Sequence, residues 1–176
     1  MAKPLVFDAT PLMYMIKVSL AESLGSLSDP KFLPASVYEE LLKGEPQGKP
    51  EASVMRELVK RAAININRPV DASQVRRLIK LAVEDERKPL HRAEAEAIVL
   101  AKELGGIVIS DDHVARSIAR LTRTELHGTG YLLGRLYREG HISKDEAMTK
   151  VGEMRRAGWR LGEDDYRTIL DYLKML

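Results

Sequence analysis

The 176-residue sequence contains no cysteine, which excludes disulfides, zinc–thiolate centres and cysteine nucleophiles. It has no apolar run near the roughly 20 residues that cross a bilayer and no signal-like N-terminal segment. We therefore expect a cytoplasmic protein without membrane contact. Asparagine and glutamine are scarce while lysine, arginine and glutamate are abundant, a balance typical of thermophile proteins. The net charge of +2 neither demands nor excludes a nucleic-acid partner, so local patterns must decide.

Short apolar runs alternate with helical patterns along the chain. The runs that are typical of buried strands lie at residues 5–7, 32–33, 64–66 and 107–109. This alternation predicts the α/β class with a parallel sheet. No repeat, linker or low-complexity tract interrupts residues 1–176, which favours one domain, and residues 128–176 are predicted to form a C-terminal helical extension.

Local signals indicate where two of the helices begin. Thr10, followed by proline, suits an N-cap, and Ser36 with Glu39 three residues later forms a capping box. The second helix is expected to end at Gly44. Because the capping box gives the Glu39 carboxylate a structural role, Glu40 is the better candidate for a ligand.

Acidic residues follow two of the predicted strands. Asp8 comes directly after the first strand, and Asp111 and Asp112 come shortly after the strand at 107–109. Ligands of open parallel sheets bind beyond the carboxyl ends of the strands, so we expect these acids at one edge. Such a cluster is costly unless a cation neutralises it, and oxygen ligands suit Mg²⁺ or Mn²⁺. Capping of the next helix needs only one member of the late pair.

Two glutamates, Glu94 and Glu96, lie among alanines and aliphatic residues of the helix that begins near Arg92. This composition leaves little solvated face, so a partly buried carboxylate there needs a partner. Either a metal ion or an arginine would serve, and the residues alone leave both interpretations open.

Four motifs in order, at residues 6–10, 34–41, 93–98 and 109–112, resemble those of PIN domains, and the stretch 128–160 is similar to the tail of an archaeal and bacterial subgroup. The usual glycine before the first glutamate of the third motif is Ala93 here, so Glu94 stays an alternative to Glu96. The resemblance implies a set of catalytic residues and metal ligands: Asp8, Glu40, Glu96, Asp111 and Asp112.

The resemblance implies a PIN-like three-layer α/β/α fold with a central parallel sheet of about five short strands. It also implies a metal-dependent ribonuclease that hydrolyses RNA with Mg²⁺ or Mn²⁺ held by the carboxylates. Such a protein acts as a toxin held by an antitoxin, or as a stand-alone RNA-processing factor. The alternative is a non-catalytic PIN-like module for RNA binding or assembly.

Residues expected to contact RNA flank the acids. Arg116, Arg120 and Arg123 recur at helical spacing after the acidic pair and would supply counter-charge to phosphates. A solvated helix face is the other interpretation of this stripe. Thr10 and Ser110 belong to the same group because they lie beside acids in the first and fourth motifs.

A homodimer is expected from apolar residues late in the chain. Leu132, Leu133 and Leu136, together with the final helix, are predicted to supply the interface. Trp159, the only tryptophan, is expected in the core or at a dimer contact rather than on an RNA base. Residues 128–130 predict a turn and a helix start, because no clear strand precedes them.

Overall fold

The computed structural model describes residues 2–43 and 45–176. Its strands are β1 (Leu5–Phe7), β2 (Lys31–Pro34), β3 (Asn65–Asn67), β4 (Ile107–Ile109) and β5 (Leu126–His127). They form one sheet in the order β3-β2-β1-β4-β5, and every neighbouring pair is parallel. The predicted α/β class with a parallel sheet is therefore confirmed. Because β1 and β4 are neighbours, the acids that follow them come side by side.

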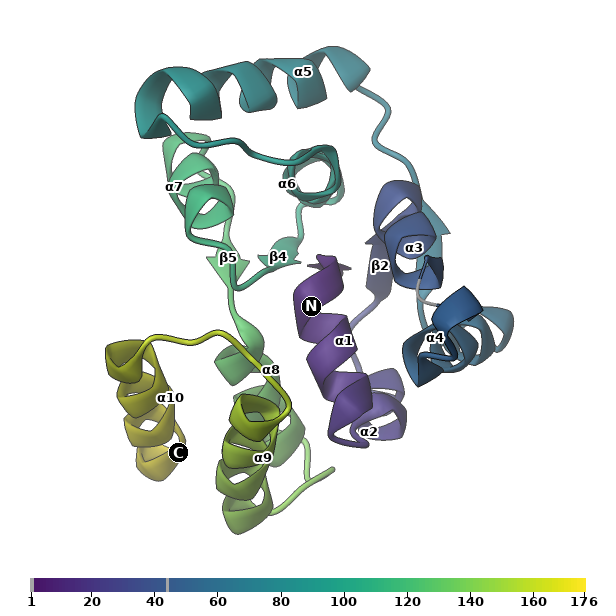
Figure 1. The fold of residues 1–176 in the computed structure, drawn as a ribbon, viewed down its shortest axis with the longest axis vertical. Coiled ribbons are helices and arrows are strands. Elements are labelled where there is room, and N and C mark those ends of the chain that lie inside the picture. The colour runs from purple at the N-terminus through teal and green to yellow at the C-terminus, as the bar shows by residue number, and fades with distance from the viewer. Residues whose placement is uncertain (1, 44) are drawn as a thin grey trace.

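The helices cover both faces of the sheet. They are α1 (Ala9–Lys17), α2 (Ala21–Ser26), α3 (Ala35–Leu42), α4 (Pro50–Lys60), α5 (Ala72–Leu81), α6 (Arg92–Leu104), α7 (His113–Leu121), α8 (Thr129–Arg138), α9 (Lys144–Arg156) and α10 (Glu163–Met175), with short turns η1 (Glu45–Gln47) and η2 (Ala82–Glu86). Figure 1 shows α5, α6 and α7 on one side of the sheet and the remaining helices on the other. No helix in the described ranges combines the length and hydropathy needed to cross a bilayer.

The side chains of the central strand β1 pack into two separate hydrophobic cores. Leu5 and Phe7 pack into the core beneath α1, while Val6 packs into the core under α6 and α7. All three side chains are fully buried. A parallel strand covered on both faces requires such a continuous apolar run, since successive side chains point to opposite faces. The apolar run ends immediately before Asp8, so Asp8 lies at the edge of the sheet formed by the carboxyl ends of the strands.

Helix α8 packs against α2, helix α9 packs against α1, and α10 packs on α8 and α9. Leu132, Leu133 and Leu136 are completely buried in this packing, within one chain. The prediction that these three leucines supply a dimer interface is therefore wrong, because helices of the same chain already cover them.

Three local predictions also differ from the structure. The N-cap of α1 is Asp8, whose carboxylate accepts the Ala9 N–H, rather than Thr10. Helix α3 begins at Ala35 without a side-chain cap, so the Ser36–Glu39 capping box does not form. The predicted helix end at Gly44 lies outside the described residues. A short strand, β5, does precede residues 128–130, and it pairs with β4.

Candidate functional site

A cavity of about 270 Å³ lies at the carboxyl ends of β1 and β4, and we call it the acid cavity. Its acidic side chains come from the residue that follows β1, from α6 and from the β4–α7 loop. The full lining is Asp8, Thr10, Met13, Tyr14, Glu94, Asp111, Asp112, Gly158, Trp159 and Arg160. The structure thus brings acids from distant parts of the sequence to the sheet edge where ligands of parallel sheets bind.

Asp8 is buried and held on both carboxylate oxygens. Its Oδ1 accepts the Ala9 N–H at 2.7 Å, and its Oδ2 accepts the Ser110 hydroxyl at 2.9 Å. Burial raises the pKa of Asp8 to about 6, and the hydrogen bonds from Ser110 and Ala9 only partly oppose this shift. The nearby charges of Glu40 and Asp112 raise the pKa further. Its ionised form is therefore costly without a cation.

Glu94 also faces the acid cavity, from the first turn of α6. Its carboxylate accepts the backbone N–H of His91 at 2.7 Å, which fixes the side chain at the helix start. Burial raises the pKa of Glu94 to about 7, and the charges of Asp112, Asp8 and Glu40 add to the shift. The Glu94 carboxylate therefore belongs electrostatically to the same cluster as Asp8.

Glu96 lies elsewhere. The Ser36 hydroxyl donates to its Oε2 at 2.5 Å, and Arg92 Nε donates to its Oε1 at 2.7 Å. It lines a different groove, with Arg68 and Arg76. Of the two partners expected for a buried glutamate of α6, Glu96 therefore has the arginine. The structure places Glu94, and not Glu96, in the same cavity as Asp8.

The two aspartates after β4 have different surroundings. Asp112 caps α7, with the Ala115 N–H donating to Oδ1 at 2.7 Å, and its charge reaches both Asp8 and Glu94. Asp111 accepts three hydrogen bonds, from the backbone and hydroxyl of Thr129 at 2.8 and 2.6 Å and from Trp159 at 3.1 Å. Asp112 is therefore the member with the greater share of its carboxylate left for a ligand.

Glu40 stands apart from the cavity wall. It is exposed on α3, and it does not line the acid cavity, yet its charge contributes to the raised pKa values of Asp8 and Glu94. Within residues 2–43 and 45–176, no three acidic or histidine side chains already have the spacing of a metal centre.

The predicted RNA contacts are distributed unevenly. Thr10 lines the acid cavity, and Ser110 lies behind it as the hydrogen-bond partner of Asp8. Arg116 is half-buried in a neighbouring cavity, whereas Arg120 is exposed on α7. Arg123 lies beyond the end of α7 with a left-handed φ of 54°. The three arginines therefore do not form one continuous helical stripe.

Two of the lining residues that sequence reasoning missed, Tyr14 and Arg160, have polar side chains of functional interest. Tyr14 lies on α1, one turn after Thr10, and burial raises the pKa of its hydroxyl. Arg160 follows Trp159 and places a positively charged guanidinium at the cavity. Its charge partly opposes the rise in the pKa of Tyr14. The helical spacing of Thr10 and Tyr14 was the available signal for the first. Only tertiary packing places Arg160.

Comparisons with known proteins bear on the fold. A family profile described as "DUF3368: PIN domain" matches residues 4–175. No curated protein matches the sequence. Among solved structures, PAE2754 from Pyrobaculum aerophilum is 19% identical, with a TM-score of 0.50, over 78% of this chain and 99% of that one. VapBC-1 from nontypeable Haemophilus influenzae is 14% identical, with a TM-score of 0.49, over 72% and 98%. The likeness to PAE2754 concerns the fold alone.

Proposed function

We propose that this chain, which belongs to the DUF3368 family of PIN domains, is a metal-dependent ribonuclease that hydrolyses RNA phosphodiester bonds. The observation that carries the proposal is the gathering of Asp8, Glu94 and Asp112 around the acid cavity. Asp8, which is buried, and Glu94, which is half-buried, have raised pKa values because of desolvation and of nearby carboxylates. A divalent cation would relieve this cost, which supports a metal-binding role.

The chemistry of the cavity fits Mg²⁺ or Mn²⁺. Its acidic donors are carboxylate oxygens, which these hard cations prefer, and no histidine is among the residues that line it. Mg²⁺ usually keeps several waters and takes only one or two carboxylates directly. Binding of such an ion therefore does not require three protein ligands already arranged around it. Asp8, Glu94 and Asp112 would hold the ion, and Glu40 would add negative charge from nearby.

Several side chains at the cavity have a definable part in the proposed reaction. A bound metal ion supplies positive charge that lowers the pKa of a water and offsets the charge on the attacked phosphate. Ser110 and the Ala9 N–H fix the orientation of Asp8, so its carboxylate needs no rearrangement of its own. Arg160 attracts the phosphates of the incoming strand to a site that is otherwise acidic.

The test is cleavage of labelled single-stranded RNA with Mn²⁺ or Mg²⁺, beside an EDTA control. We expect cleavage that needs metal and disappears in Asp8→Asn. The matched control is Asp71→Asn, which changes the aspartate that caps α5, outside the cavity. That variant should cleave like wild type.

Two other outcomes contradict the proposal. If the folded wild-type protein cleaves none of several RNAs, the chain is instead a non-catalytic RNA-binding or assembly module. Cleavage that survives Asp8→Asn would reject the carboxylate mechanism. The same chemistry serves both a toxin that an antitoxin holds inactive and a stand-alone RNA-processing factor, and both roles belong to the proposal.

A further inference from the structure

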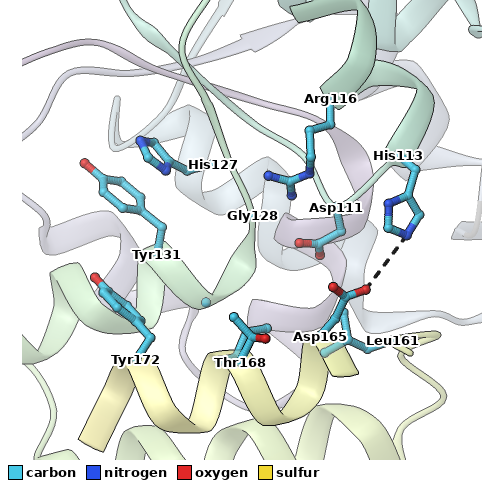
Figure 2. Close-up of a pocket in the computed structure, with 12 residues that line it drawn as sticks. Asp111, His113, Arg116, His127, Gly128, Tyr131, Leu161, Asp165, Thr168 and Tyr172 are labelled. Carbon is cyan, nitrogen blue, oxygen red and sulfur yellow. Dashed lines mark ion pairs between the residues drawn. The ribbon is translucent and has the colours of Figure 1, made fainter. Parts of the chain in front are cut away.

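A second and larger cavity, of about 550 Å³, adjoins the acid cavity. It lies between the start of α7, the loop from β5 to α8, and α10, and Figure 2 shows its lining. Asp111 lines both cavities. Because the two cavities share this residue, they adjoin each other, and a strand bound at the acids can extend toward the second cavity.

One side of this cavity is aromatic. Figure 2 shows His127, Tyr131 and Tyr172 together on that side. The rings of His127 and Tyr131 are stacked, with centroids 4.2 Å apart and planes 12° apart. The polar ends of all three rings already have partners: Glu125 for His127, Arg135 for Tyr131 and Arg138 for Tyr172. The rings are therefore fixed in place as a wall against which a flat apolar group can pack.

The opposite side carries an arginine, Arg116, that lacks a side-chain partner among the described residues. Arg116 is half-buried, and in the described part of the chain its guanidinium makes no hydrogen bond or ion pair. Its neighbour Asp111 already accepts bonds from Thr129 and Trp159. Asp165, the other carboxylate of this cavity, lies with its Oδ2 3.9 Å from His113 Nε2. A partly desolvated guanidinium favours an anion, and phosphate matches its forked geometry.

We propose that this second cavity is a nucleotide subsite, with a phosphate on Arg116 and the base against His127, Tyr131 and Tyr172. The subsite rests on the proposed ribonuclease function, and it would hold the nucleotide beside the one that is cleaved. Single-stranded RNA is commonly bound by stacking of bases on aromatic side chains combined with cationic contacts to phosphate. The volume also lies within the range of about 300 to 1,000 Å³ found for ligand pockets.

The C-terminal extension builds this subsite. Helix α10 contributes Tyr172 and three further lining residues, Asp165, Thr168 and Ile169. It approaches α8 closely because α8 has glycine where α10 crosses. A Cβ at Gly130 would lie 2.9 Å from Ile169. The extension therefore has a function beyond covering the core, since it closes one side of the nucleotide subsite.

The binding test uses adenosine 5′-monophosphate in EDTA, so that it does not depend on metal or cleavage. NMR with labelled tyrosine rings should show shifts at Tyr131 and Tyr172. We expect adenosine 5′-monophosphate to bind about tenfold tighter than ribose 5-phosphate, because stacking of one base contributes roughly that factor. Arg116→Ala should weaken binding about tenfold. Tyr131→Ala should also weaken it, while Tyr131→Phe, which keeps the ring, restores it.

The cleavage test separates this inference from the proposed function. With RNA and Mn²⁺, Arg116→Ala and Tyr131→Ala should raise KM about tenfold with little change in kcat. Arg77→Ala, on the exposed surface of α5, removes the same charge and should keep the wild-type KM. Wild-type KM in both cavity variants would overturn the subsite while leaving the nuclease intact. Nucleotide binding without any RNA cleavage would instead reject the nuclease and keep the subsite. Adenosine 5′-monophosphate that binds no tighter than ribose 5-phosphate would also overturn it.

Discussion

The Asp111 carboxylate accepts a hydrogen bond from the indole N–H of Trp159 at 3.1 Å, across 48 positions of sequence. The same carboxylate accepts the backbone N–H and hydroxyl of Thr129 at the start of α8. Trp159 is 4% exposed, and its ring packs at an angle against Tyr14 with centroids 6.1 Å apart. One acid at the sheet edge therefore connects β4, α8 and the segment between α9 and α10.

Trp159→Phe should destabilise the protein. The substitution keeps an aromatic ring against Tyr14 but removes the donor to Asp111, and a hydrogen bond to a charged group contributes about 1.5 to 3 kcal/mol. We expect a loss of this size in urea unfolding followed by circular dichroism. A double-mutant cycle with Asp111→Ala, which removes the acceptor, isolates the pair from the lost ring volume. Additive losses in the cycle would contradict a direct coupling between the two side chains.

The stability of the metal-free protein should fall as pH rises from about 4 to about 7. The pKa of Asp8 is raised to about 6 and that of Glu94 to about 7, so the folded state binds more protons than the unfolded chain in this window. Stability is then greatest below the unfolded values and reaches its lower level above the folded ones. Thermal unfolding in EDTA at several pH values measures this slope.

Asp8→Asn should raise metal-free stability at pH 7.5. The rise in the pKa of Asp8 to about 6 corresponds to roughly 3 kcal/mol, and loss of charged hydrogen bonds reduces the net gain to about 1 to 2 kcal/mol. Asp71→Asn should act in the opposite direction. Hydrogen bonds from Ser73 and Gln74 lower the pKa of Asp71 to about 2, so its ionised form stabilises the helix above pH 4 and loses this effect in acid. Equal signs for both variants would refute the electrostatic origin.

Glu94 and Glu96 should differ in their effect on metal binding. Mn²⁺ should raise the unfolding temperature of wild type and of Glu96→Gln by a similar amount, because Glu96 is bonded to Ser36 and Arg92. Glu94→Gln should lose most of that rise, although its amide oxygen can still accept the His91 N–H. A larger loss in Glu96→Gln than in Glu94→Gln would restore the ligand choice that the sequence motif favours.

The structure explains why this choice was difficult from sequence. Residues two apart on an α-helix point in directions about 200° apart, so only one of Glu94 and Glu96 can face the sheet edge. Alanines and aliphatic residues surround both, and α6 is covered along most of its length. The rotation of α6 is set by its packing on the sheet, which no local pattern records.

Local patterns were sufficient where a residue's place depends on its immediate neighbours. The apolar runs of β1 and β4 fix both strands, and they bring Asp8 and Asp112 to one edge through parallel pairing. Strand β5 has only two residues, Leu126 and His127, and it exists through its pairing with β4. The contact of Asp111 with Trp159 likewise depends on how the extension docks. Such long-range partners leave no signal in a short window.

Gly128→Ala should damage the site through Asp111. A Cβ at Gly128 would lie 2.7 Å from Asp111 Oδ1, so the carboxylate would have to move away from Thr129 and Trp159. The backbone of Gly128, with φ −99°, suits alanine, so the effect comes from this contact alone. We expect lower stability by about 1 to 3 kcal/mol and weaker RNA cleavage.

Gly152→Ala is the matched control, because its nearest neighbour is the flexible end of Arg156 at 3.5 Å and alanine favours the α9 helix by up to about 1 kcal/mol. Urea midpoints that fall equally in both variants would show that the Gly128 contact with Asp111 has no special role.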